Sequence, residues 1–264
     1  MSKKRKTVRK KRSGCTKVIL LMVLIAAVIV CVRGIDAGKS AEQIVQKYAD
    51  RHNIYMSEYP DEMIQLLASN KETKKFVLEY PEKKDLAPEI SLDKEVRGGG
   101  VPRLLQWDQR WGYREYGDGI IGITGCGPTC RSMVYIYLTG DTSMNPYQMA
   151  QYSQSSGYYV NGTGTSWELM GNGASNLGLD VTQIPLDRDR VISNLEAGNP
   201  VICSMGPGKF TKTGHFIVLT EYENGKFKVN DPNSKKRSRH KWSYEDIAES
   251  VLNIWVTFFL FSYR

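Results

Sequence analysis

Histidine is scarce in this sequence, since the 264 residues include only His52, His215 and His240. Any chemistry that needs an imidazole as a base or as a metal ligand must therefore use one of these three side chains. A structural zinc site needs four ligands. Cys126 and Cys130 are spaced like one half of such a site, but no second Cys/His pair follows them. We therefore expect no metal and no cofactor.

Acidic residues are absent from the first 17 positions, which hold nine Lys and Arg side chains. The formal net charge of the whole chain is +8, and the remainder has 27 basic and 28 acidic side chains. The excess of positive charge is thus confined to the tail and does not support a nucleic-acid-binding domain. We expect no nucleic-acid partner.

An apolar run of the usual transmembrane length, about 20 residues, is also missing. The longest stretch, residues 18–32, has 15 apolar residues, and the basic residues on either side can reach the bilayer surface with their charged ends. A basic-then-apolar order fits a cleaved signal peptide or an uncleaved signal anchor. We favour a transmembrane anchor over residues 18–33, because Ile35 stands where a cleavage site after Ala37 needs a small residue.

The basic tail is expected to keep the N-terminus in the cytoplasm. The protein is then a single-pass membrane protein through residues 18–33, with everything that follows outside the cell. Cys126, Cys130 and Cys203 belong to this exported part. Three thiols cannot all pair within one chain, so at least one is free and is a candidate for reactivity.

Composition divides the chain into four segments. We expect a basic cytoplasmic tail at 1–17, the anchor at 18–33, a helical stalk and linker at 34–98, and a folded domain at 99–264. The stalk has short helical patterns that are too polar to form a core alone. Three successive glycines at residues 98–100 mark the linker and the domain boundary.

Three short helices are expected within the stalk. Residues 41–52 have apolar side chains at helical spacing. Pro60 suits the first position of the second helix. Asn70 is expected to cap the third helix, and Pro81 is expected to end it.

The remaining chain has an α+β pattern, because helices come first and strands dominate later. The Asn224-Gly225 pair predicts a hairpin turn between two of the strands. Beyond the helix that starts at Cys126, further helices are expected at 166–178 and 189–198, and strands at 200–205, 215–223, 226–231 and 254–263.

The motif TGCGPTC around Cys126 carries the clearest chemical signal. Gly125 and Gly127 allow a close backbone approach, and Pro128 suits the first turn of a helix. Cys126 is therefore expected at a helix N-terminus, where N–H groups favour a thiolate and can hold an oxyanion. Cys130 is expected one turn further, facing the core. A disulfide between the two cysteines, strained across one helical turn, is the minor alternative.

A nucleophilic thiol needs a base. His215 opens an apolar strand after a glycine, at an edge where its side chain can meet a cleft. His52 lies in the stalk, and His240 lies in the charged run SKKRSRHK, which we interpret as a solvated loop. His215 is therefore the candidate base.

An acid that orients the imidazole is expected on the partner strand of the hairpin. Pairing about the Asn224-Gly225 turn brings the region of residue 234 opposite His215. Asp231 is near enough to reach the ring after a small offset. Asn230 and Asn233 compete for the same role.

The order Cys126, His215, Asp231, on a helix followed by a hairpin, resembles papain-like cysteine peptidases. The motifs GCGPT, GHFIVL and NDP are similar to those of the bacteriocin-processing peptidases, family thirty-nine of the cysteine peptidases, and in particular to stand-alone exported members from Gram-positive bacteria. The stretch VPRLLQWDQRW resembles the opening of that domain, where a Gln helps to form the oxyanion hole. The resemblance assigns this role to Gln106, with Gln109 as a weaker candidate.

This resemblance covers roughly residues 55–264 and implies a papain-like domain with Cys on its helix and His and Asp on an antiparallel sheet. The implied activity is hydrolysis of peptide bonds, with a peptide or protein substrate at the cell surface. No G-x-x-x-x-G-K-[ST] motif occurs, unlike in family members fused to export ATPases. An amidase or transpeptidase acting on cell-wall peptides, and a non-catalytic peptide-binding module, are the alternatives on the same fold.

Overall fold

The structure is a computed structural model that describes residues 19, 21–23 and 39–259. The predicted basic tail and nearly all of the predicted anchor at 18–33 lie outside the described residues. Among the residues that are described, no helix combines the length and the apolar character needed to cross a bilayer. The chain forms two compact units, Met1–Lys71 and Glu72–Arg264. The expected boundary between residues 98 and 99 stays a prediction.

The first unit is helical where it is described beyond residue 38. Residues 39–52 form one helix, and η1 (Met56–Glu58) and α2 (Asp61–Ser69) follow. Pro60 is the N-cap of α2 and not its first residue, and Asn70 ends α2 directly before the helical segment predicted to follow it, which begins at Lys71. The helices are present, but they give no support for the expected stalk.

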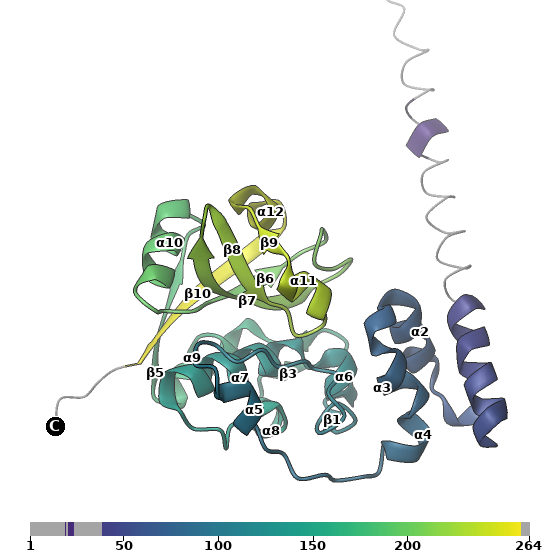
Figure 1. Ribbon diagram of the computed structural model, residues 1–264. Helices are drawn as coiled ribbons and strands as arrows, with labels where there is room; N and C mark the ends of the chain where they lie inside the picture. Colours follow the sequence, from purple (N-terminus) through teal and green to yellow (C-terminus); the bar gives the residue numbers. More distant parts are fainter. Residues whose placement is uncertain (1–18, 20, 24–38, 260–264) are drawn as a thin grey trace, which may run out of the picture. The chain divides into compact units, whose positions relative to one another are not determined.

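The second unit is built on a six-stranded sheet with the order β5-β10-β6-β7-β8-β9 (Figure 1). Every neighbouring pair is antiparallel. The predicted hairpin, the strand before it and the final strand are confirmed. The strands are β5 (Leu179–Ile184), β6 (Val201–Met205), β7 (His215–Glu223), β8 (Lys226–Asn230), β9 (Lys241–Trp242) and β10 (Val251–Phe259), with β1 (Glu115–Tyr116) paired to β2 (Gly119–Ile120) and β3 (Tyr159–Val160) to β4 (Gly164–Thr165) in two small sheets.

Helices cover both faces of the sheet, with α7 and α8 on one side and α10 and α12 on the other (Figure 1). The long helix α7 begins within the TGCGPTC motif, at Cys126, as predicted. The helical elements of this unit are η2 (Lys71–Thr73), which begins in the first unit, α3 (Lys74–Leu78), α4 (Tyr80–Lys83), α5 (Asp93–Val96), α6 (Ile121–Thr124), α7 (Cys126–Thr139), α8 (Pro146–Ser155), η3 (Trp167–Leu169), α9 (Asn172–Asn176), α10 (Arg188–Glu196), α11 (Lys235–Arg239) and α12 (Tyr244–Ala248).

Three local expectations were wrong. The helix predicted at 166–178 is broken into η3 and α9, because Gly171 between them has φ −99° and ψ −97°, outside the helical region. Pro81 does not end a helix but lies in the first turn of α4, where its missing N–H costs nothing. The charged run SKKRSRHK is not a loop, because Ser234 accepts a hydrogen bond from the Arg237 N–H and caps α11.

The central strands β6 and β7 are buried on both faces, which explains their nearly continuous apolar sequences. Alternate residues of β7 belong to different cores, since Phe216 and Val218 pack with α7 whereas Ile217 and Leu219 pack on the other side of the sheet. Strand β7 is therefore held firmly from both sides, and its first residue is His215. The sheet thus fixes the position of this imidazole against the start of α7.

Candidate active site

Cys126 is the first residue of α7, as predicted, and it is partly exposed. Gly125 is the N-cap and Pro128 lies in the first turn. Gly127 permits a close contact, because a Cβ built on it would lie 2.5 Å from Cγ2 of Thr165. The first N–H groups of a helix have no partners within that helix. The sulfur of Cys126 therefore lies beside backbone donors at the start of α7.

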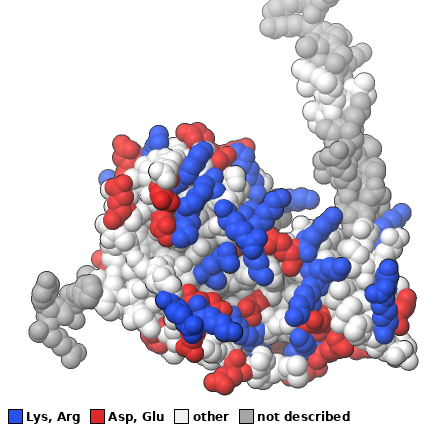
Figure 2. All heavy atoms as spheres, in the orientation of Figure 1, with Lys and Arg blue, Asp and Glu red and all other residues white. Residues whose placement is uncertain are grey.

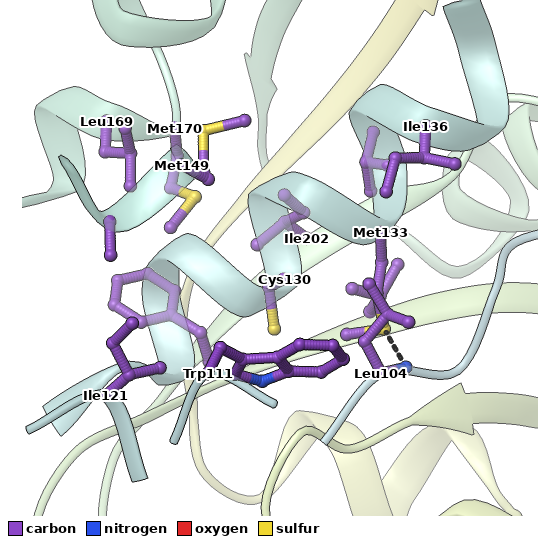
Figure 3. Close-up of a cluster of buried hydrophobic side chains, with 14 of the residues drawn as sticks. Leu104, Trp111, Ile121, Cys130, Met133, Ile136, Met149, Leu169, Met170 and Ile202 are labelled. Atoms are coloured by element: carbon purple, nitrogen blue, oxygen red, sulfur yellow. Dashed lines mark hydrogen bonds between the residues drawn. The ribbon is translucent and has the colours of Figure 1, made fainter. Parts of the chain in front are cut away.

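Cys130 faces the core, as predicted. It is fully buried, and Figure 3 shows its sulfur pointing toward the ring of Trp111. Burial raises the pKa of the Cys130 thiol well above its ordinary value, with smaller contributions in the same direction from Cys126 and Asp231. Cys203 in β6 is also fully buried, and burial raises the pKa of its thiol. The three cysteines that the structure describes are free thiols, and Cys126 alone among them is not buried.

The hairpin β7–β8 brings His215 and Asp231 together. Its register pairs Glu223 with Lys226 next to the turn and Val218 with Asn230 further on, after a one-residue shift between Leu219 and Glu221. Strand β8 ends at Asn230, so that Asp231 is the next residue and lies near the start of β7. Regular pairing would bring the region of residue 234 opposite His215. The one-residue shift in the ladder brings Asp231 closer to the His215 ring.

His215 Nε2 and Asp231 Oδ1 lie 2.9 Å apart. The His215 residue is 7% exposed and Asp231 is fully buried. Burial alone lowers the pKa of His215, but the charge and hydrogen bond of Asp231, together with a hydrogen bond to the Cys126 side chain, raise it to about 9. Because Nε2 is engaged by Asp231, Nδ1 is the ring nitrogen that remains for the Cys126 sulfur. The structure therefore joins His215 to Asp231 by a hydrogen bond and places the ring near enough to Cys126 for the two side chains to interact.

This buried pair makes stability depend on pH. The pKa of His215 is raised from 6.5 to about 9, so its contribution to folding is complete below pH 6.5 and is lost as the pH rises through about 9. The pKa of Asp231 is lowered from 3.8, because His215 and Arg237 outweigh the opposing effect of burial. The Asp231 contribution is therefore complete above pH 3.8 and is lost as the pH falls through the lowered value.

We expect the free energy of unfolding of the native protein to exceed that of His215→Gln most between about pH 4 and 6.5. The difference should shrink steadily as the pH approaches 9, because His215 loses its proton and a neutral imidazole no longer forms an ion pair with Asp231. Urea unfolding of both proteins across this range measures the effect. A difference that stays constant from pH 6 to 9.5 contradicts the assigned ion pair.

Gln106 lies between the two parts of the site. Its side-chain Nε2 donates to the carbonyl oxygens of Gly122 (3.0 Å) and Ile123 (3.1 Å), a few residues before Cys126. Its backbone N–H donates to the carbonyl of Pro232, next to Asp231, at 2.8 Å. Gln106 is 3% exposed. Its Nε2 is therefore already used by two carbonyls, and an oxyanion role requires one of these hydrogen bonds to be exchanged.

Gln109, the weaker candidate, is engaged elsewhere. Its Nε2 donates to Glu79 at 2.8 Å and to the Tyr113 hydroxyl at 3.1 Å, and its Oε1 accepts from Lys83 at 3.1 Å. These contacts connect it to α3 and α4 and not to Cys126. Gln106 is thus the better placed of the two glutamines.

The competitors of Asp231 and His215 have other contacts. Asn230 donates through Nδ2 to the carbonyl of Val101 at 2.9 Å. Asn233 donates its backbone N–H to Asp231 Oδ1 at 2.8 Å, so it supports the carboxylate and does not replace it. His240 ends α11, is exposed, and packs edge-on against Trp242.

Arg237 was missed by the sequence reasoning. Its Nε donates to Asp231 Oδ2 at 2.5 Å, on the oxygen that His215 does not use. The sequence signal was present, because Asp231-Pro232 followed by Ser234 predicts a turn and then a helix N-cap. A helix starting after Ser234 carries Arg237 back toward Asp231 within its first turn.

Two solved structures are among those similar to this chain. The chain is similar to the peptidase domain of Streptococcus ComA, a bi-functional ABC transporter involved in a quorum sensing pathway, with 20% identity over 52% of this chain and 93% of that chain and a TM-score of 0.42. It is also similar to a putative C39-like peptidase from Bacillus anthracis, with 14% identity over 59% of this chain and 94% of that chain and a TM-score of 0.37. No curated protein matches the chain.

The model of the Peptidase C39 like family matches residues 99–258. This match covers more than half of the chain and includes Cys126, His215, Asp231 and Gln106. The expected family, and the mixed architecture with an antiparallel sheet, are confirmed. The chain therefore belongs to the Peptidase C39 like family.

Proposed function

We propose that the protein is a papain-like cysteine peptidase that hydrolyses peptide bonds with Cys126, His215 and Asp231. The observation that carries the proposal is the 2.9 Å hydrogen bond between His215 Nε2 and Asp231 Oδ1, on a ring whose pKa the Cys126 side chain also raises. A nucleophile, a base and an acid that orients the base are the parts that acyl transfer through a thiol requires.

The reaction starts from the pair in which His215 already holds the proton of the Cys126 thiol, and the sulfur attacks the carbonyl carbon of the substrate. The negative oxygen is stabilised by the backbone N–H at the start of α7 and by the Gln106 amide. The C–N bond then breaks, and His215 gives its proton to the leaving amine. A thioester between Cys126 and the acyl part of the substrate remains.

In the second half His215 takes a proton from water, and the resulting hydroxide attacks the thioester. The C–S bond breaks, a carboxylic acid is released, and His215 keeps the proton beside the Cys126 sulfur, which restores the starting pair. Asp231 stays ionised throughout and holds the ring. The net reaction consumes one water for each peptide bond.

The proposal is tested by incubating the full-length protein with a peptide library in ¹⁸O-labelled water and identifying the products by mass spectrometry. A peptidase produces two fragments, and the new carboxyl group carries ¹⁸O. Fragments joined to another amine without ¹⁸O instead show acyl transfer. No turnover of any peptide contradicts the proposed activity.

Selective labelling of Cys126 by iodoacetamide is expected in the native protein. Cys126 is partly exposed, whereas Cys130 and Cys203 are fully buried and their pKa values are raised by burial. Peptide mapping measures each site, and the two buried thiols should react only after unfolding in urea. In a His215→Gln variant the Cys126 rate should fall about 10-fold or more, because the base is removed.

Equal rates at Cys126 and Cys130 in the native protein contradict this assignment, as does an unchanged Cys126 rate in His215→Gln. The same labelling in urea provides the control, because it shows that every thiol is chemically intact.

The proposed location is outside the cell membrane, with residues 18–33 as a single-pass anchor and the N-terminus in the cytoplasm. The support is the sequence, in which nine basic residues precede 15 apolar ones. A protease added to intact cells should then digest residues 34–264. Protection of this part until the cells are lysed contradicts the location.

A further inference from the structure

The helix that follows Asp231 folds back onto that residue. The Ser238 hydroxyl accepts from the Asp231 N–H at 2.9 Å and lies 3.3 Å from the Asp231 carbonyl oxygen. Both residues are buried. Helix α11 is therefore attached to the backbone of Asp231 as well as to its side chain, and a shift of the helix displaces the carboxylate.

Arg237 differs from its basic neighbours on α11. Figure 2 shows Lys and Arg side chains over the surface where Figure 1 places β8 and α11. Lys236 and Arg239 are exposed, but the Arg237 side chain is only 26% exposed and its Nε lies 2.5 Å from Asp231 Oδ2. The two carboxylate oxygens are thus divided between His215 and Arg237. This fixes the plane of the carboxylate from two sides.

Glu72 holds the other end of α11. One of its carboxylate oxygens accepts from the Ser234 hydroxyl at 2.5 Å and from the Lys236 N–H at 3.3 Å, and the other accepts from the Lys235 N–H at 3.0 Å. A carboxylate in this position satisfies N–H groups that have no partner within the helix. Glu72 lies before residues 99–258, which match the family model.

The segment around Glu72 is also attached to the part of the domain that leads to Cys126. Phe76, one turn further, is 2% exposed and stacks on Tyr113 with ring centroids 4.3 Å apart. The Tyr113 hydroxyl donates to the Phe76 carbonyl at 2.7 Å. A Cβ on Gly122 would lie 2.5 Å from the Phe76 ring, which shows how closely the ring packs there. The segment therefore contacts both sides of the site, at α11 through Glu72 and at Gly122 through Phe76.

We propose that Arg237 and Glu72 are positioning residues of this active site: Glu72 fixes α11, and Arg237 on α11 fixes the carboxylate that holds His215. The inference rests on the proposed function of Cys126 and Asp231. It assigns a role in the site to a residue outside the matched family region.

The charge of Arg237 gives the proposal a measurable signature. The charged and titratable groups that face the His215–Asp231 pair are Arg237 from α11 and the thiols of Cys126 and Cys130 from α7. Arg237 attracts the carboxylate and opposes a positive charge on the ring. Its removal leaves the full charge of Asp231 to act on His215, so the pKa of His215 should rise.

The first experiment compares Arg237→Gln, Arg237→Lys and the control Arg239→Gln in the full chain. Arg239 is on the same helix and is exposed. In Arg237→Gln we expect kcat to fall roughly 10- to 100-fold with KM little changed, because the base is misplaced. The His215 titration, followed by NMR of histidine-labelled protein, should move up by about half a pH unit or more. Arg237→Lys should recover part of both effects, and Arg239→Gln should match the native protein.

The second experiment compares Glu72→Gln with the control Glu89→Gln. Glu89 is an exposed carboxylate that, like Glu72, lies before residues 99–258. Glu72→Gln should change kcat and the His215 titration in the same direction as Arg237→Gln. The double variant should be no worse than Arg237→Gln alone, because both residues act through one carboxylate. Glu89→Gln should have no effect.

If the pKa of His215 in Arg237→Gln equals that in the native protein, the proposal is wrong. Fully additive effects of the Glu72 and Arg237 variants also overturn it. The titration separates this proposal from the proposed function. If the native protein hydrolyses nothing, the peptidase assignment fails, but the His215 titration still decides whether Arg237 and Glu72 set the state of the ring. A variant whose melting temperature shows partial unfolding is replaced by Arg237→Lys, which keeps the charge and tests the geometry alone.

Discussion

Cys126→Ala is expected to lower kcat/KM for peptide hydrolysis at least about a thousand-fold, because no other side chain in the site supplies a nucleophile. The fold should stay intact. Cys126 is partly exposed at the first position of α7, and the buried face of that helix is made by other residues such as Cys130, Met133 and Val134. The measurements are single-turnover kinetics on the peptide identified from the library and the midpoint of thermal unfolding.

Cys203→Ala is the matched control. Cys203 is fully buried in β6, in the core on the side of the sheet away from α7. Removing its sulfur should cost about 1–2 kcal/mol of stability and leave kcat/KM unchanged below the melting transition. Cys126→Ala should thus lower turnover without lowering stability, and Cys203→Ala should lower stability without lowering turnover. An active Cys126→Ala protein excludes the proposed nucleophile.

The parts of the site that the sequence predicted rest on local signals. Gly125 and Pro128 predicted a helix start at Cys126, and the Asn224-Gly225 pair predicted the hairpin that carries His215. Both signals act within a few residues, where backbone preferences decide the structure. Cys126, His215 and Asp231 could be named from the sequence because each of them adjoins such a signal.

The parts that the sequence did not predict depend on contacts between distant residues. Glu72 and Ser234 are 162 positions apart, and no periodicity relates them. Helix α11 was interpreted as a loop because its five residues, Lys235–Arg239, are all polar and have no apolar face. Its stability comes from the local Ser234 cap and Asp231 contact and from Glu72, which is a tertiary contact. A short polar helix of this kind shows no apolar periodicity, and only the Ser234 cap signal could have indicated it.

Gln106 was identified from a local sequence motif, but its contacts depend on distant residues. Its place before Trp107 in a family-like motif identified it, but its contacts with Gly122, Ile123 and Pro232 come from the fold. These contacts show that the loop of Gln106 joins the segment before Cys126 to the segment after Asp231. They also show an Nε2 already occupied, which the motif alone did not indicate.

Asp231→Asn is expected to have the largest combined effect on stability and turnover. The amide oxygen can still accept from His215 and from the Asn233 N–H, but its NH₂ group then takes the place of Oδ2. That group faces Arg237 Nε, which lies 2.5 Å from Oδ2 in the native protein, so two donors would be brought together. Removing one partner of a buried ion pair costs roughly 3–5 kcal/mol. The pKa of His215 should fall because its neighbouring charge is lost.

Arg237→Met in the Asp231→Asn background is expected to restore part of the lost stability, about 1–2 kcal/mol, because it removes the cation that has no counter-charge. The apolar side chain also ends the contact between two donors, and the neutral amide remains free to hold His215. Arg237→Met alone should destabilise the protein. Its effect on the free energy of unfolding should therefore have one sign with Asp231 and the opposite sign in the Asp231→Asn background. Urea unfolding of the native protein, both single variants and the double variant measures this coupling. If the two substitutions are additive, Arg237 and Asp231 act independently and the shared carboxylate does not organise the site.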